Sequence, residues 1–237
     1  MRICLLSAFL LCNIFILQAQ DVRSICFKIN ELNNSVRDGK VSKILAKDQF
    51  KELMAGLDKA ISPKPGVMEW VFPLQGYKSN AIGGSRGNGY QDKGYNYFDG
   101  NKHLAHPAHD IFINDRNQDD LDDKTHQPVN VLAVEGGIVV ACSNEWSEAS
   151  TLRGGRYVWI YHPVHHIISY YAHNRVIFVS PGDEDSQGQK IAEVGRTGFN
   201  AFKKRSPTHL HFGTYQLTGG LPVPFNSYAF LIKAKTK

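Results

Sequence analysis

Three separated motifs contain residues of the types that suit a metal ion: one contains His106 and Asp110, one contains His173, and one contains His209 and His211. His106-Pro107-Ala108-His109-Asp110 places a histidine and a carboxylate four residues apart, just before an apolar run. Much later, His209 and His211 stand two residues apart at the start of a β-rich run. Because residues i and i+2 of a strand point to the same face, these two imidazoles are expected to face one space.

The third motif, Tyr170-Tyr171-Ala172-His173, ends a β-rich run between the other two. Two imidazoles and one carboxylate on rigid strands suit a catalytic zinc ion, which takes three protein ligands and keeps a fourth position open for water. Each motif alone also fits ordinary core or surface histidines. The order of the motifs and their strand context together favour one divided metal site.

The elements that must position these residues change character along the chain. Residues 21–62 carry two apolar stripes with spacings of three and four, which predict two amphipathic helices. Asp38-Gly39 is a turn signal between them, and 62–66 is a Pro/Gly-rich linker. From Trp70 onward, short β-rich runs alternate with Gly, Pro and Asn clusters. We expect a mostly β fold, a sandwich of antiparallel strands, with two N-terminal helices.

The N-terminus has the form of an export signal. Arg2 is followed by the apolar run 3–17 and by a short polar, small-residue exit, so a secretory signal peptide over 1–20 is expected. An uncleaved anchor is the alternative. The expected organisation is therefore a signal peptide (1–20), a helical segment with its linker (21–66) and a catalytic domain (67–237), with no membrane span after cleavage. Cys26 and Cys142 would remain, either as one disulfide or as two buried thiols.

Composition excludes several function classes. The chain has 237 residues, 42% of them hydrophobic, which excludes a largely disordered protein. The net charge is +5, and no dense Lys/Arg tract is present, so a nucleic-acid partner is not expected. The sequence does not indicate an oligomeric state.

Taken together, the motifs resemble the lysostaphin/LytM-type zinc endopeptidases, which cut bacterial cell-wall peptides. The resemblance extends from about Phe72 to Tyr228. The segment 106–110 matches the family's His-x-Gly-x-Asp motif with Ala108 in place of Gly, 209–211 matches His-x-His, and 171–173 matches Tyr-x-His. The substitution at Ala108 adds one methyl group and removes no ligand.

The resemblance implies specific roles. His106, Asp110 and His211 would bind one zinc ion, and His173 and His209 would be the catalytic histidines. The implied function is an exported zinc metalloendopeptidase, periplasmic or extracellular, that hydrolyses peptidoglycan stem peptides or crosslinks. Two alternatives stay open: a catalytically inactive, zinc-holding module that binds cell wall or activates an amidase, and a zinc peptidase that acts on ordinary proteins.

Two further groups of residues are weaker candidates. Asp115, Asn117 and Asp119 space oxygen ligands like the start of a Ca²⁺ loop, although Asp120 stands where an EF-hand has Gly. A solvated acidic loop is the alternative. Separately, Tyr95 and Tyr97 either wall a substrate groove or pack their long loop.

Arg196 belongs to a basic loop that either attracts substrate carboxylates or is simply solvated. The two N-terminal helices either cap the groove or support the core, and the need to bury both stripes favours support.

Overall fold

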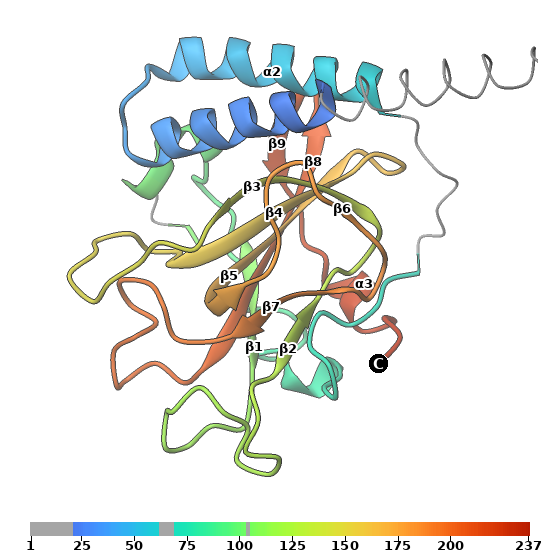
Figure 1. Cartoon of the computed structure of the whole chain (residues 1–237). Coiled ribbons are helices and arrows are strands. Elements are labelled where there is room, and N and C mark those ends of the chain that lie inside the picture. The colour runs from blue at the N-terminus through green and yellow to red at the C-terminus, as the bar shows by residue number, and fades with distance from the viewer. Residues whose placement is uncertain (1–20, 62–68, 103–104) are drawn as a thin grey trace, which may run out of the picture.

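The computed structural model describes residues 21–61, 69–102 and 105–237. The expected signal peptide (1–20) and linker (62–66) lie outside these residues. Residues 21–37 are helical, and α2 spans Lys43–Ala60. Figure 1 shows both helices side by side along one side of the sheet. No helix in the described ranges is long and apolar enough to cross a membrane.

All strands of the described residues belong to one nine-stranded antiparallel sheet. Its central path runs in the order β1-β8-β5-β4-β3-β6, with β9 paired to β8 and β7 paired to β2 and β5. The strands are β1 (Ala108–Phe112), β2 (Asn130–Leu132), β3 (Gly137–Ser143), β4 (Arg156–His162), β5 (Ile167–Ile177), β6 (Glu184–Asp185), β7 (Lys190–Val194), β8 (His209–Thr218) and β9 (Leu221–Pro224). The predicted antiparallel β fold with two N-terminal helices is confirmed.

Short helices complete the chain. Two 3-10 helices, η1 (Ser79–Ala81) and η2 (Tyr97–Lys102), lie in the long segment before β1, and α3 (Tyr228–Leu231) follows β9. An isolated bridge from Ile82 to Ile111 ties that segment to β1, and a second bridge, from Gln91 to His106, closes the segment on itself. The loop that leads into the first motif is therefore held in place at both points.

The sheet buries both of its faces. Because neighbouring strand residues point to opposite sides, Tyr171 packs in one apolar cluster and Ala172 packs in the other. The second cluster includes the helices, with Cys26, Ile29 and Leu57 packed against strand residues. The N-terminal helices thus share one core with the sheet.

Local sequence explains the helix ends. Gly39 has a φ of 67°, and its N–H donates to the carbonyl of Val36, which closes the first helix. The hydroxyl of Ser42 then accepts from the N–H of Leu45 and caps α2. The turn predicted at Asp38-Gly39 is confirmed, and so is the second apolar stripe.

Cys26 and Cys142, the two cysteines within the described residues, are free thiols. Cys26 is buried in the cluster that includes the helices, whereas Cys142 packs against the cluster on the opposite face of the sheet. The structure therefore favours the two-thiol alternative over a disulfide. Burial raises the pKa of Cys26 to about 12, so this thiol stays protonated.

Candidate metal centre

Three neighbouring strands bring the three motifs together. Asp110 on β1 is the registered partner of His211 on β8, and His211 is also the registered partner of Ala172 on β5. His173 follows Ala172 directly. His209 shares a face of β8 with His211, as the i, i+2 spacing predicts. Motifs about a hundred residues apart in sequence thus meet on adjacent strands.

His106, Asp110 and His211 form a compact donor set. Asp110 Oδ1 lies 3.2 Å from His106 Nε2 and 3.0 Å from His211 Nδ1. One ligand atom from each of the three residues lies within 4.8 Å of the others. Ligand atoms on a tetrahedral zinc ion stand about 3.4 Å apart, given Zn–N and Zn–O lengths of about 2.1 Å. The two nitrogens and one carboxylate oxygen therefore fit a zinc ion that keeps an open position.

Backbone carbonyls orient three of the imidazoles. His106 Nδ1 lies 3.0 Å from Gly89 O, His173 Nδ1 lies 2.8 Å from Thr197 O, and His209 Nδ1 lies 2.7 Å from Pro207 O. A carbonyl oxygen only accepts, so each Nδ1 must donate and each Nε2 of a neutral ring carries a lone pair. His209 Nε2 lies 3.6 Å from Asp110 Oδ1, which places this lone pair at the donor set.

The surroundings set the charge of the donor set. Burial disfavours the Asp110 carboxylate, but the adjacent His106 and His211 rings outweigh it and hold its pKa far below the usual range. Burial lowers the pKa of His211 to about 4, against the opposing effect of Asp110. At neutral pH the site therefore offers a carboxylate and a neutral His211 imidazole, the forms that bind metal.

His173 and His209 stand beside the donor set. Their ring centroids are 4.9 Å apart, and the His173 ring is 5.4 Å from that of His211. Both side chains are buried. His173 has a φ of 67°, in the left-handed region that is uncommon for residues other than Gly, although Asn, Asp and His are found there more often than most. The backbone at His173 therefore departs from the extended strand conformation.

A pocket of about 290 Å³ opens over all five residues. Its walls include residues of the long loop, of the β3–β4 loop, of the segment before β8 and of the first helix. Tyr95 and Tyr97, expected either to wall a groove or to pack their long loop, both line this pocket. The Tyr95 hydroxyl is 3.2 Å from that of Tyr215, and the Tyr97 hydroxyl donates to Asn33 Oδ1 at 2.8 Å.

Arg196 is placed elsewhere. It is buried, and its guanidinium donates to the carbonyls of Ser206 and Lys203 and to the hydroxyl of Thr208. It is not among the residues that line the pocket. The expectation that Arg196 attracts substrate carboxylates is corrected, because the side chain instead clamps its own loop together.

The acidic loop uses its oxygens internally. The Asp115 carboxylate accepts from the N–H groups of Asp119 and Asp120 and from the Thr208 hydroxyl, while Asn117 donates to Asp119. Among the described residues, the candidate metal cluster is the His106, Asp110 and His211 set alone. A Ca²⁺ site is therefore not supported, because hydrogen bonds already satisfy the oxygens that would bind it.

Some groove residues escaped the sequence analysis. The pocket is also lined by Asn33 and Arg37 of the first helix, by Arg153 and by Tyr170. An aromatic face could have been predicted from the i, i+2 spacing of Tyr157 and Trp159 on β4 together with Tyr170 on the next strand. No local pattern could have placed the first helix beside it, because that contact depends on long-range packing.

Comparisons with known proteins agree with the geometry. Residues 118–223 match the family described as Peptidase family M23. This range contains His173, His209 and His211, whereas His106 and Asp110 join the site through the β1–β8 pairing. No curated protein matches the chain.

Among solved structures, a putative glycyl-glycine endopeptidase LytM from Ruminococcus gnavus is 20% identical, with 80% of this chain and 71% of that chain covered and a TM-score of 0.49. The catalytic domain of the antimicrobial peptidase lysostaphin from Staphylococcus simulans is 22% identical, with 54% and 79% covered and a TM-score of 0.38. A putative peptidase M23 from Pseudomonas aeruginosa is 17% identical, with 78% and 60% covered and a TM-score of 0.43. It is the family match over residues 118–223 that bears out the expected resemblance to lysostaphin/LytM-type peptidases.

Proposed function

Since the chain carries a peptidase family M23 region at residues 118–223, we propose that it is an exported zinc metalloendopeptidase that hydrolyses peptide bonds in peptidoglycan. One observation supports this most strongly. The donor set His106, Asp110 and His211 and the two oriented rings of His173 and His209 share one pocket. Metal ligands with proton-accepting groups beside them are what amide hydrolysis by a bound water requires.

In this proposal, His106 Nε2, Asp110 and His211 Nδ1 hold the ion. When bound, zinc would act as a Lewis acid and lower the pKa of its water toward ~7. The carbonyl of Gly89 fixes the His106 ring, so the ligand needs little reorganisation to bind.

The two remaining histidines move the proton. His209 Nε2 lies beside the donor set and carries a lone pair. We therefore propose that His209 accepts the proton of the attacking water. His173 Nε2 is also an acceptor while its Nδ1 donates to Thr197, so this ring orients the same water. The proton on His209 then passes to the leaving nitrogen as the amide bond breaks.

Substrate and compartment are part of the proposal. The proposed signal peptide (1–20) would export residues 21–237 to the periplasm or the cell exterior, where cell wall is within reach. The helical segment (21–66) and the catalytic domain (67–237) are proposed as one folding unit, because the helices pack on the sheet.

Purified sacculi provide the test. Wild-type protein is expected to release muropeptides, a zinc chelator is expected to stop the release, and added zinc is expected to restore it. His209→Ala, which keeps all three ligands, serves as the matched inactive control. Sacculus binding without chelator-sensitive release would contradict the enzyme and favour a binding module. Digestion of casein without sacculus release would point to ordinary protein substrates.

A further inference from the structure

Aromatic side chains form one wall of the pocket that holds the metal donor set. Three of these rings lie in a row: the Tyr170 ring centroid is 4.5 Å from that of Trp159, and the Trp159 ring is 4.9 Å from that of Tyr215. Tyr170 also packs edge-on against the proposed ligand His211, with ring centroids 5.9 Å apart and ring planes at 80°. The aromatic wall therefore begins directly beside the donor set, and Tyr170 connects the two.

The hydroxyl of Tyr170 differs from those of the other tyrosines that line the pocket. The others are bonded within the protein: those of Tyr95 and Tyr215 to each other at 3.2 Å, and those of Tyr97 and Tyr157 to the side chain of Asn33. Within the described part of the chain, the Tyr170 hydroxyl makes no hydrogen bond. Its oxygen is also not among the buried polar atoms that lack a partner, so solvent reaches it in the pocket. A partly buried phenol usually finds a partner, so this one is available to a ligand.

The missing side chain of Gly154 makes room for this hydroxyl. A Cβ at that position would overlap the Tyr170 oxygen, whereas it would stand 3.5 Å from the ring carbon that bears the oxygen. The Gly154 carbonyl also accepts the N–H of His173 at 3.0 Å. The Tyr170 hydroxyl therefore lies against the loop residue that is bonded to the backbone of a proposed catalytic histidine.

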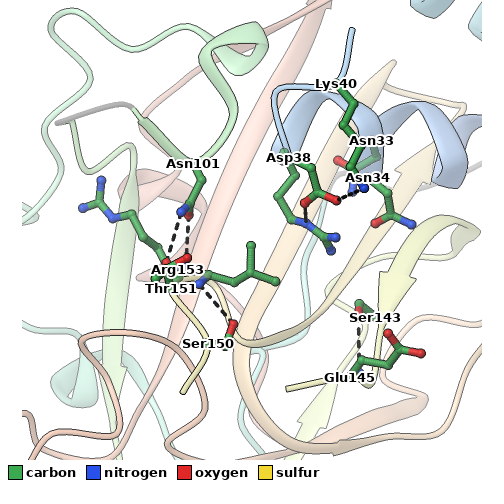
Figure 2. Close-up of polar contacts among 12 residues, drawn as sticks. Asn33, Asn34, Asp38, Lys40, Asn101, Ser143, Glu145, Ser150, Thr151 and Arg153 are labelled. Carbon is green, nitrogen blue, oxygen red and sulfur yellow. Dashed lines mark hydrogen bonds and ion pairs between the residues drawn. The ribbon is translucent and has the colours of Figure 1, made fainter. Parts of the chain in front are cut away.

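The loop around Gly154 is anchored on both sides. The N–H of the preceding residue donates to Asn101 Oδ1 at 3.0 Å, and Asn101 Nδ2 donates back to Thr151 O at 3.1 Å (Figure 2). The following residue is also a glycine, and it lies so close to Thr197 that a Cβ would overlap the Thr197 carbonyl group. Because the backbone under the Tyr170 hydroxyl is fixed, the hydroxyl has a defined position before any ligand binds.

We propose that the Tyr170 hydroxyl donates a hydrogen bond to a backbone carbonyl oxygen of the bound peptide, close to the bond that is cleaved. The inference rests on the proposed peptidase function and adds a substrate-binding residue to it. An extended peptide offers one carbonyl about every 3.5 Å, so a peptide placed over the donor set has a carbonyl near a ring that contacts His211. A donor that is already in position loses little conformational entropy when the peptide binds.

Tyr170→Phe tests the hydrogen bond because it removes the oxygen and keeps the ring. Binding of a synthetic stem pentapeptide is measured on zinc-loaded His209→Ala, so that turnover does not intervene. Adding Tyr170→Phe should weaken binding about 3- to 10-fold, as loss of one hydrogen bond predicts. Muropeptide release by the protein that retains His209 should slow to a similar extent. Zinc content and thermal stability should not change, because the hydroxyl has no protein partner.

Tyr90→Phe is the matched control. It makes the same chemical change at a tyrosine that does not line the pocket and whose hydroxyl donates to the exposed Asp92. Pentapeptide affinity and muropeptide release should stay at their unsubstituted values in this variant.

Gly154→Ala provides a second, independent change. Where Tyr170 is present, the added methyl group displaces its hydroxyl, so pentapeptide affinity should fall by about the same factor. In Tyr170→Phe the oxygen is gone and the methyl group makes an ordinary contact with the ring, so Gly154→Ala should have little further effect. This non-additivity in peptide affinity would not arise if Tyr170 only supported the fold.

Unchanged affinity in Tyr170→Phe, or additive losses in the double variant, would overturn the assignment even if sacculi are digested. Weaker binding in Tyr170→Phe without any hydrolysis by the wild type would support the binding residue and contradict the peptidase.

If the pentapeptide is not bound, casein is the second probe, and kcat/KM for casein should fall in Tyr170→Phe. An unchanged value of kcat/KM, or no cleavage of casein at all, would then overturn the assignment. Failure of the binding residue and failure of the peptidoglycan substrate are therefore distinguishable.

Discussion

Asp110 and His211 face each other across the β1–β8 ladder, with Asp110 Oδ1 3.0 Å from His211 Nδ1. This pairing joins the first and last motifs of the chain in one register. A slip of one residue would turn either side chain to the opposite face of the sheet. The candidate metal centre therefore depends on strand pairing as much as on the identity of its proposed ligands.

Ala108 starts β1 opposite Gly213, and it is where the chain departs from the resembled family's His-x-Gly-x-Asp motif. Its side chain is buried. Ala108→Gly removes a packed methyl group and frees a strand backbone, so we expect the free energy of unfolding to fall by ~1 kcal/mol. Zinc content and kcat should stay at wild-type values. Denaturant unfolding and metal analysis check both, and zinc loss would show that the alanine holds the ligands in place.

Gly198 lies against the back of the His173 ring. A Cβ at this position would stand 2.8 Å from His173 Nδ1 and would overlap the carbonyl of Arg153, and the φ of 116° disfavours L side chains. Gly198→Ala should therefore displace the ring and lower kcat about 10-fold or more while all three metal ligands remain. Steady-state kinetics and zinc content are the measurements. Wild-type kcat in a correctly folded Gly198→Ala protein would contradict the role given to His173.

The carboxyl group of Asp185, which does not line the pocket, should make the stability of the protein depend on pH. Burial, with Asp183 nearby, raises its pKa from 3.8 to about 7, and no described donor pairs with Oδ2. Between pH ~4 and ~7 the unfolded chain has released this proton and the folded protein keeps it, so stability falls as pH rises through that window.

Asp185→Asn removes this loss. Above pH 7 the variant should be more stable than the wild type by roughly 2–4 kcal/mol, and the difference should shrink toward zero near pH 4. Denaturant titrations at several pH values measure it. Glu184→Gln, on the neighbouring exposed position, is the control for a simple loss of negative charge. A difference that does not vary with pH would show that Asp185 is ionised in the folded protein.

The helices should be essential to the fold. Leu57 is fully buried in the cluster that also holds Ala172, the neighbour of His173. Leu57→Ala should lower the free energy of unfolding by about 2–5 kcal/mol, whereas Ile44→Ala, at a position 79% exposed, should change it by less than about 0.5 kcal/mol.

A shortened chain that starts at Val67 should therefore be insoluble or unfolded. A soluble, active product would instead support the idea that the helices cap or regulate the groove.

The metal centre was predictable because its motifs carry local geometry. The i, i+2 spacing of His209 and His211 sets a shared face on any strand, and the apolar runs around Asp110 and Ala172 mark β1 and β5. The strand order could not be predicted from local patterns. It depends on the pairing of β1 with β8 and of β8 with β5, which are far apart in the sequence.

The groove was harder to predict. Arg37 ends a helix whose apolar stripe gives no sign of what it packs against, so its place in the pocket follows only from tertiary contacts. Arg196 stands among basic loop residues, yet it is buried because three oxygens of its own loop satisfy its guanidinium. Basic character in a loop sequence does not distinguish a ligand-binding arginine from a structural one.

The zinc content of two variants, changed at neighbouring positions on the same face of β8, is the most direct test of the proposed metal site. His211→Ala removes one of three ligands, whereas His209→Ala removes the proposed proton acceptor and leaves the donor set whole. We predict about one zinc per chain in the wild type and in His209→Ala, and little or none in His211→Ala. Turnover should fall about 10²-fold or more in His209→Ala. Equal loss of zinc in both variants would contradict the division of the site into ligands and proton-transfer groups.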